Sequence, residues 1–557
     1  MKISGARFVA ETLKGYGITH VFYVEAILRR ALVEMEALGI ERILTHSEKA
    51  AAYMADGYAR VSRRPGICMA QSVGAANLAS GLQDPFPRLS PVIAITGRKP
   101  PIAQHRNAYQ EILHSKMFEP VTKLTACVET VEQLPHLLRQ AFREAVSSAP
   151  GPVHLDFLGY EGELTDLSEA PIEVLVEDRF RQYPPFRPEP EPGSVREASE
   201  ILKAAKRPVI VAGGGAAVSA AGPEVIELAE TLCIPVATSL NGKGIIPENH
   251  RLAVGVVGSY SQWCANRVVY ESDLVLFVGS RTGDQVTNNW TIPGKATKVI
   301  QIDVDPTELG RNYPNVVSLA GDAKAILRVM GEYCYMPSPH RTAWSEYAHG
   351  LVEQWNAEFF PLRLSDAVPI RVERLCEDLT RTLPPNGILV SDTGYAGIWT
   401  GAMVRLHDKG QSYIRAAGSL GWGFPAALGA KCAAPSRPVI CFIGDGGFYY
   451  HLSELETALR RHINVVVIVN NNSCFRQCLE GINHAYGARA GAKEAMYKFI
   501  PTNFFKIAKD FGCEGIRVEE PSHIIPSLKR ALTSDRTTVI DVVTDEGCRP
   551  PSPWMPE

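Results

Sequence analysis

Short apolar runs recur along the chain, and several of them lead through a glycine-containing turn into a helix-like segment. GICMA (66–70), VIVAGGG (209–215) and VICFIGDGG (439–447) each follow an Arg-Pro pair. PVIAITG (91–97) and NVVVIVNNN (464–472) each fit the next buried strand after a helix. Apolar runs without polar alternation, separated by helices, are typical of parallel strands covered on both faces. The pattern predicts an α/β protein with three doubly wound parallel-sheet domains, the first and third related by duplication.

Two proline-rich segments divide the chain between these domains. Residues 183–194 (YPPFRPEPEPGS) lack apolar periodicity and are expected to form a stiff linker. A second boundary lies near residues 336–341 (MPSPHR). We therefore expect an N-terminal domain over 1–182, a central domain over 195–335 and a C-terminal domain over 365–548.

The balance of charge narrows the class of function. The 557 residues include 57 Lys and Arg against 60 Asp and Glu, so the sequence indicates neither a nucleic-acid nor an anionic-membrane partner. No uncharged apolar stretch approaches the roughly 18 residues of a membrane span, and the charged N-terminus does not fit a signal peptide. The 12 cysteines are scattered without a CxxC pair, which argues against a zinc site or a disulfide framework. We expect a reduced, cytoplasmic enzyme that acts on small molecules.

The most informative pattern lies in residues 444–474. A buried strand leads into Gly444-Asp445-Gly446-Gly447, a helix follows, and a second buried strand leads into Asn470-Asn471-Asn472. Parallel neighbours joined by a helix end at the same edge of a sheet, so Asp445 and Asn472 are expected to converge. Carboxylate, amide and carbonyl oxygens are ligands that Mg²⁺ or Ca²⁺ prefers, and the glycines let backbone amides approach a diphosphate.

This arrangement resembles the diphosphate- and metal-binding motif of thiamine-diphosphate (ThDP) enzymes. The resemblance implies that Asp445, Asn472 and the carbonyl of Cys474 hold Mg²⁺. HSEKAAAYMADGYAR (46–60) is similar to the family segment whose glutamate, here Glu48, activates the aminopyrimidine of the cofactor.

Two further segments resemble the same family. AAGSLGWGFPAALGA (416–430) is similar to the stretch whose apolar residue, here Leu420, enforces the bent conformation of the cofactor. SDTGYAG (391–397) resembles the loop on the diphosphate side, with Tyr-Ala in place of the usual Gln-His. The resemblance assigns cofactor contacts to Glu48, Gly394, Tyr395, Ala396, Gly418, Leu420, Asp445, Gly446, Gly447, Asn472, Cys474 and Phe475.

Within the ThDP enzymes the chain looks closest to acetolactate synthase large subunits. QSVGAANLASGLQDPF (71–86) and NAYQE (107–111) resemble their segments, which implies substrate contacts at Tyr109 and Gln110. Arg98 is expected either to pair with a substrate carboxylate or to form a surface ion pair. The central block resembles the FAD-binding version of its domain, with Gly213, Gly214, Gly215, Arg281 and Asp303 as candidate contacts. Some relatives bind another adenine nucleotide there and others nothing, so FAD stays one of three alternatives.

The loop Phe22–Ile27 departs from the family, because the usual Pro-Gly-Gly is replaced and brings in Glu25. Relatives place this loop beside the reactive carbon, so Glu25 is either a catalytic proton donor or base, or an exposed or ion-paired acid. YYHLSE (449–454) is also similar to cyclohexane-1,2-dione hydrolase.

The resemblance implies a carboligase or lyase that acts on 2-oxo acids or related ketones, in the manner of acetolactate synthase. The alternatives are hydrolysis of a diketone, simple decarboxylation of a 2-oxo acid and flavin-dependent oxidation. A non-catalytic relative is disfavoured because Glu48, Asp445 and Asn472 are intact. The family pairs its two cofactor-binding domains between chains, which implies a homodimer at minimum and a homotetramer as the expected assembly.

Overall fold

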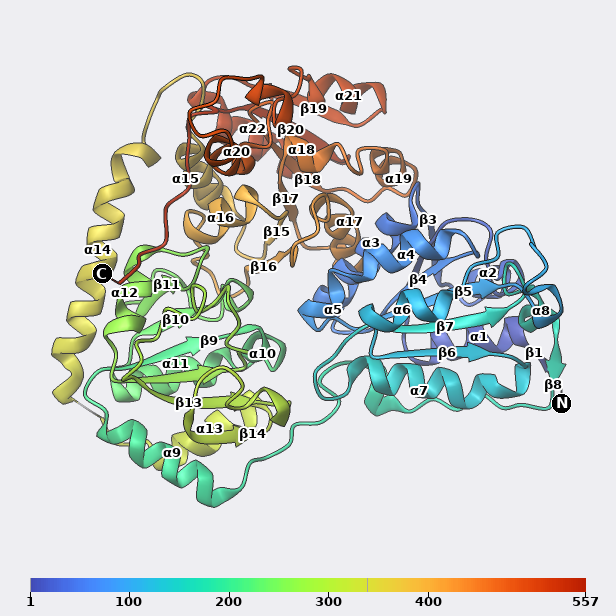
Figure 1. The fold of residues 1–557 in the computed structure, drawn as a ribbon, viewed down its shortest axis with the longest axis horizontal. Helices are drawn as coiled ribbons and strands as arrows, with labels where there is room; N and C mark the ends of the chain where they lie inside the picture. The colour runs from blue at the N-terminus through green and yellow to red at the C-terminus, as the bar shows by residue number, and fades with distance from the viewer. Residues whose placement is uncertain (1, 338, 557) are drawn as a thin grey trace.

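The computed structural model describes residues 2–337 and 339–556, so Ser338 in the second predicted linker lies outside it. In the described ranges the chain builds three six-stranded parallel sheets, one in each third of the sequence (Figure 1). The predicted fold class is therefore confirmed. A short antiparallel pair, β1 (Ile3–Ser4) and β8 (Glu169–Ala170), lies beside the first sheet.

The N-terminal and C-terminal sheets share one strand order. In spatial order the N-terminal sheet contains β3 (Glu41–Leu44), β2 (His20–Tyr23), β4 (Gly66–Ala70), β5 (Val92–Arg98), β7 (Val153–Leu158) and β6 (Leu124–Val128). The C-terminal sheet contains β16 (Ser412–Arg415), β15 (Ile388–Ser391), β17 (Val439–Gly444), β18 (Val466–Asn471), β20 (Thr538–Val543) and β19 (Glu514–Val518). Both sheets run second, first, third, fourth, sixth, fifth in chain order, which is the relation that a duplication would leave.

The central sheet has a different order, which is the one common to dinucleotide-binding folds. Its strands are β11 (Ala253–Val256), β10 (Val236–Thr238), β9 (Pro208–Ala212), β12 (Leu274–Val278), β13 (Lys298–Asp303) and β14 (Asn315–Ala320). The order reverses between β9 and β12, so the glycine-rich turns after these two strands lie side by side.

Helices α3 (Glu48–Ser62) and α17 (Gly423–Ala433) join the N-terminal and C-terminal domains. A Cβ on Gly57 would lie 2.8 Å from both the carbonyl carbon and the Cα of Ala426, and one on Gly429 would lie 2.7 Å from the carbonyl carbon of Met54. Glycine at both positions therefore lets the two backbones touch. One apolar core runs through this crossing and contains buried residues of both domains. The long helix α14 (Thr342–Arg363) packs in a second core that joins the central and C-terminal domains (Figure 1).

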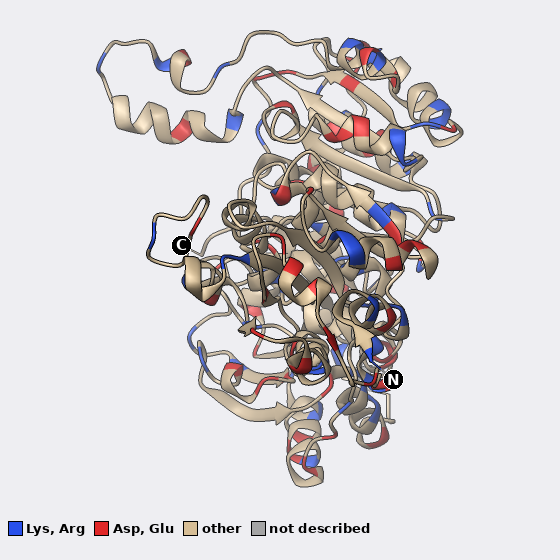
Figure 2. Ribbon diagram, turned by 90° about the vertical axis from the view of Figure 1, so that its right-hand side faces the viewer, with Lys and Arg blue, Asp and Glu red and all other residues tan. Residues whose placement is uncertain are grey.

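Charged residues are distributed over all three domains. Figure 2 shows segments of both signs interspersed along the ribbon, with neither sign gathered on one domain. Each helix in the described ranges is too short or too polar to span a bilayer.

Candidate active site

The strand order of the C-terminal sheet reverses between β15 and β17. The two strands pair in parallel with Ser391 opposite Phe442, so the turns that follow them are neighbours. The segment after β15 begins with Asp392, and β17 ends at Gly444, the first residue of GDGG. The rest of GDGG opens the single helical turn α18 (Asp445–Phe448), and we call residues 444–447 the GDGG turn. Ligands of doubly wound sheets bind at such a reversal, beyond the carboxyl ends of the strands.

Asp445 and Asn472 converge at this edge, as the strand spacing predicts, and Cys474, which the resemblance adds, lies beside both. The Asp445 carboxylate accepts the N–H of Gly446 at 2.7 Å and the N–H of Cys474 at 3.2 Å. The Cys474 thiol donates to Oδ1 of Asn472 at 3.4 Å. Burial raises the pKa of Asp445 to about 6, and none of the described Lys, Arg or His side chains forms an ion pair with it. A buried carboxylate without a cationic side chain, beside an amide oxygen and a backbone carbonyl, is a donor set that fits Mg²⁺.

The glycines of the GDGG turn leave no room for side chains. A Cβ on Gly446 would overlap the Phe475 ring, and one on Gly447 would overlap the carboxylate of Asp392. Both glycines are buried against these neighbours. Only bare backbone fits between them, so the turn presents main-chain groups to whatever binds above it.

The third predicted cofactor loop lies against the same edge. Gly394 has a φ of 68° and leads into α16 (Tyr395–Ala402). A Cβ on Gly394 would lie 2.8 Å from the amide oxygen of Gln477, just beyond the metal-side segment. Tyr395 is half-buried and Ala396 is buried, so the loop is closely packed and has no histidine.

Glu48 begins α3, directly after the turn that follows β3. Its carboxylate accepts a hydrogen bond from the side-chain amide of Asn77 at 3.1 Å. A Cβ on Gly74 would lie 2.6 Å from Oε1 of Glu48, so α4 (Gly74–Leu82) approaches the carboxylate through a glycine. Glu48 is half-buried and is held at the carboxyl edge of the N-terminal sheet.

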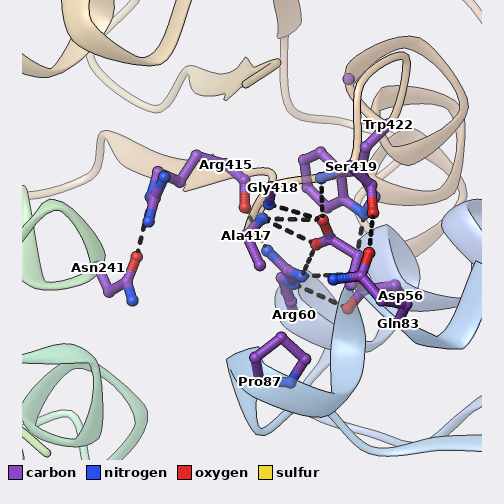
Figure 3. Close-up of polar contacts among 12 residues, drawn as sticks. Asp56, Arg60, Gln83, Pro87, Asn241, Arg415, Ala417, Gly418, Ser419 and Trp422 are labelled. Atoms are coloured by element: carbon purple, nitrogen blue, oxygen red, sulfur yellow. Dashed lines mark hydrogen bonds and ion pairs between the residues drawn. The ribbon is translucent and has the colours of Figure 1, made fainter. Parts of the chain in front are cut away.

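Two buried carboxylates hold the loop that carries Leu420. Asp84 accepts backbone N–H groups of residues 417, 418 and 419 at 2.9–3.2 Å. Asp392 accepts the N–H of Gly421 at 3.0 Å and that of Gly423 at 3.4 Å. Burial raises the pKa of Asp392 to about 7. Figure 3 shows Arg60 and Gln83 beside the backbone of 417–419.

Neither carboxylate was found from the sequence. Asp392 stands directly after the buried strand β15 and inside the motif SDTGYAG, so its position was a local signal in the sequence. Asp84 lies 333 residues away from Ala417 in the sequence, and no local pattern connects the two.

On the substrate side, Glu25 and Arg98 both lie in ion pairs with residues of their own domain. Glu25 is exposed and pairs with Arg29, which also reaches Glu161 at 2.6 Å. This contact fits the ion-paired alternative for Glu25. Arg98 pairs with Glu129 and lies 3.8 Å from the buried Asp156.

Tyr109 and Gln110 lie in a loop between β5 and α6 (His114–Phe118). Tyr109 is exposed, and its hydroxyl accepts a hydrogen bond from the Gln110 amide at 3.0 Å. The Gln110 amide oxygen accepts from the hydroxyl of Tyr160, and its carbonyl accepts from Ser72 at 2.5 Å. The loop is thereby fixed to the segment after β7 and to the turn after β4, while the side chain of Tyr109 is exposed.

A cavity of about 800 Å³ lies where the three domains meet. Gly214, Gly215, Arg281 and Asp303 line it, so four of the five candidate nucleotide contacts are brought together. Gly213 is absent from the lining; it donates its N–H to the Val278 carbonyl at 2.8 Å and thereby joins the turns after β9 and β12.

Charged side chains line this cavity, and some of them come from outside the central domain. Burial raises the pKa of Asp303 to about 6. Nε of Arg88 and Nη1 of Arg415 are buried without a hydrogen-bond partner among the described residues. These two arginines come from the N-terminal and C-terminal domains, so the sequence of the central block gave no indication of them.

Family models for thiamine pyrophosphate enzymes match all three domains. The N-terminal TPP binding domain matches residues 3–117, the central domain residues 195–330 and the C-terminal TPP binding domain residues 392–542.

Curated relatives match along nearly the whole chain. A probable acetolactate synthase large subunit of Methanocaldococcus jannaschii is 32% identical over 98% of this chain and 92% of its own length. One from Methanococcus aeolicus is 34% identical over 90% of this chain and 85% of its own. The acetolactate synthase isozyme 3 large subunit of Escherichia coli is 29% identical over 98% and 95%. The chain belongs to the family of thiamine-pyrophosphate-dependent enzymes.

Proposed function

We propose that the chain is an acetolactate-synthase-type carboligase, which decarboxylates a pyruvate-like 2-oxo acid and joins the remaining fragment to a second carbonyl. The observation that carries the proposal is similarity over nearly the full chain to proteins named acetolactate synthase large subunits. Convergence of Asp445, Asn472 and Cys474 at one edge supports it.

The residues of this chain fit bound ThDP and Mg²⁺. ThDP, when bound, supplies a carbanion that adds to a ketone carbonyl and accepts the electrons of the C–C bond that breaks. Asp445, Asn472 and the Cys474 carbonyl would hold the metal, and the bare backbone of Gly446 and Gly447 admits a diphosphate. Glu48 would exchange a proton with the pyrimidine ring, because its carboxylate has an acceptor oxygen that is held in place by Asn77. Leu420 would support the bent form of the cofactor.

FAD is the ligand that we propose for the cavity between the domains. The central strand order, the glycine-rich turns after β9 and β12, and a volume of about 800 Å³ support a dinucleotide. The buried guanidinium atoms of Arg88 and Arg415 that lack hydrogen-bond partners would suit an anionic ligand such as a diphosphate. Purified protein carrying FAD would be yellow and would release flavin on denaturation, whereas colourless, flavin-free protein would contradict this assignment.

The proposed active unit is a homodimer, and a homotetramer is the expected assembly. Glu48 of one chain would face the GDGG turn of the other, in the manner implied by the family resemblance. Sedimentation of the ThDP-loaded protein tests this assembly, and a monomer that turns over substrate would overturn it.

Turnover of pyruvate with added ThDP and Mg²⁺ tests the proposed reaction. We expect release of CO₂ together with acetolactate, and loss of both in Glu48→Gln, which keeps the size of the side chain and removes its charge. CO₂ released with acetaldehyde as the product would indicate simple decarboxylation. Cleavage of a cyclic dione without use of pyruvate would overturn the proposal in favour of a hydrolase.

A further inference from the structure

Asp84 holds a segment of another domain through its backbone. It lies in the turn between α4 and α5 (Pro85–Arg88) of the N-terminal domain and is fully buried. Its carboxylate accepts the N–H of Ala417 at 2.9 Å, of Gly418 at 3.2 Å and of Ser419 at 3.1 Å. All three donors belong to the C-terminal domain, so one side chain fixes three successive amides across a domain boundary.

Neighbouring groups hold the carboxylate itself in place. Arg60 of α3 lies 3.0 Å from Asp84 and donates to the carbonyl of Arg415 at 2.6 Å. The same guanidinium lies over the ring of Trp422, 4.5 Å from its centre, and Trp422 donates its indole N–H to Asp56 at 2.9 Å. These contacts attach α3 to both ends of the loop 416–422 (Figure 3).

We call the hydrogen bonds from the amides of 417–419 to Asp84 the clamp. Because of the geometry of the peptide bond, this clamp also fixes the direction of the Gly418 carbonyl. The carbonyl of Gly418 and the N–H of Ser419 share one planar trans peptide, so they point in opposite directions. Because Asp84 holds the N–H, the Gly418 carbonyl is directed away from Asp84. Gly418 is exposed, and a Cβ built on it would meet no atom within 4 Å, so its outward face is open to a ligand.

Asp392 holds a second peptide plane of the same loop, through the N–H of Gly421. It accepts the N–H of Gly421, which shares its peptide plane with the carbonyl of Leu420. Ser419 and Leu420 therefore lie between two peptide planes, one held by Asp84 and one held by Asp392. The Leu420 side chain is half-buried, and the direction of its Cα–Cβ bond follows from the backbone that the two carboxylates hold.

We propose that Asp84 is a positioning residue of the ThDP site, which orients the Gly418 carbonyl and Leu420 toward the cofactor. The inference rests on the proposed placement of ThDP against this loop. Asp84 touches neither cofactor nor substrate; it acts through the backbone of 417–419. In the proposed dimer, the N-terminal domain would thus contribute Asp84 to the site of its own chain and Glu48 to the site of the other chain.

Asp84→Asn tests the proposal, with Asp273→Asn as the matched control. Asparagine keeps the shape of the side chain but turns an N–H₂ group toward the loop amides. Asp273 also accepts two backbone N–H groups, those of Lys206 and Arg207 at 2.8 and 2.9 Å, at the opposite, amino edge of the central sheet. Both variants lose a backbone clamp, but only Asp84→Asn changes the loop with Leu420.

The first measurement is amide hydrogen exchange of the cofactor-free protein, followed by mass spectrometry. We expect protected amides at 417–419 in the parent, faster exchange there in Asp84→Asn, and parent-like exchange in Asp273→Asn. Unchanged protection in Asp84→Asn would show that the Asp84 carboxylate does not hold the amides of 417–419. This measurement requires neither cofactor nor substrate.

The second measurement is exchange of the thiazolium C2 proton of bound ThDP, followed by NMR after quenching. We expect a decrease of about 10- to 100-fold in Asp84→Asn, the range for a small misplacement of reacting groups, with ThDP affinity nearly unchanged. A parent-like rate in Asp84→Asn, or an equal decrease in Asp273→Asn, would overturn the positioning role.

Gln83→Ala provides a milder change at the same place if Asp84→Asn does not fold. It removes the hydrogen bond of 2.8 Å between the Gln83 amide oxygen and the Ser419 hydroxyl. A smaller decrease in C2 exchange supports the proposal, and a parent-like rate contradicts it. A parent that exchanges C2 rapidly but forms no acetolactate would defeat the proposed reaction and leave the role of Asp84 standing.

Discussion

The crossing of α3 and α17 gives the most direct test of how the two cofactor-binding domains pack. Gly57→Ala adds one methyl group, which would lie 2.8 Å from two backbone carbons of Ala426. Carbon atoms at their optimal separation are about 3.5–4.0 Å apart. The helices must therefore separate by about 1 Å, because backbone cannot move aside as a flexible side chain does.

The magnitude follows from two opposing terms. Overpacking of a close-packed contact costs about 1–3 kcal/mol, and rigid backbone on both sides favours the upper end of that range. Alanine is better than glycine within a helix by about 1 kcal/mol. The expected net effect is a loss of about 2 kcal/mol of stability at the interface.

Urea unfolding monitored by tryptophan fluorescence measures this effect through the midpoint of the transition. Gly350→Ala in α14 is the control, because a Cβ there would meet no atom within 4 Å, and the helix-propensity gain should raise its midpoint. Gly429→Ala should lower the midpoint, and the double variant should lose less than the sum, since one separation relieves both clashes. A Gly57→Ala protein that unfolds at or above the parent midpoint would refute the packing.

Two further predictions concern the buried acids of the site. Burial raises the pKa of Asp392 to about 7, from about 3.9 in an unfolded chain, so the folded protein holds this proton more tightly. Stability of the cofactor-free protein should therefore fall as the pH rises from about 4 to about 7, by up to about 4 kcal/mol. Asp392→Asn should flatten that dependence in urea midpoints taken across the range; a slope equal to that of the parent would contradict the assignment. Asp445→Asn removes the carboxylate of the proposed metal site, so calorimetry should show ThDP affinity at least about tenfold weaker at limiting Mg²⁺, whereas unchanged affinity would exclude Asp445 as a ligand.

The local pattern of apolar runs and glycine-rich turns was sufficient to predict the three parallel sheets of this protein. Buried strands are apolar along their whole length, and glycine-rich turns mark their carboxyl ends, so the three parallel sheets follow from the order of residues. Asp445 and Asn472 were predicted to converge because their strands are consecutive parallel neighbours, and adjacency in such a sheet follows from short connections.

The sequence also narrowed the role of Glu25 to two alternatives without deciding between them. The ion pair between Glu25 and Arg29 forms because α2 (Arg29–Ala37) begins directly after the loop. The ion pair of Arg98 likewise depends on the fold, because its partner Glu129 follows a strand that lies two places away in the sheet.

The remaining features of the site depend on how the three domains pack against one another. The clamp of Asp84 on residues 417–419 and the orphan guanidinium atoms of Arg88 and Arg415 in the cavity join parts of the chain that share no local periodicity. Periodicity reports which face of an element is buried, but it does not report which other domain covers that face. Contacts between domains depend on the shape of surfaces such as the α3–α17 crossing, where two glycines set the distance of approach. The sequence by itself therefore determined the sheets and the cofactor motifs, while only the tertiary structure decided what holds those motifs in position.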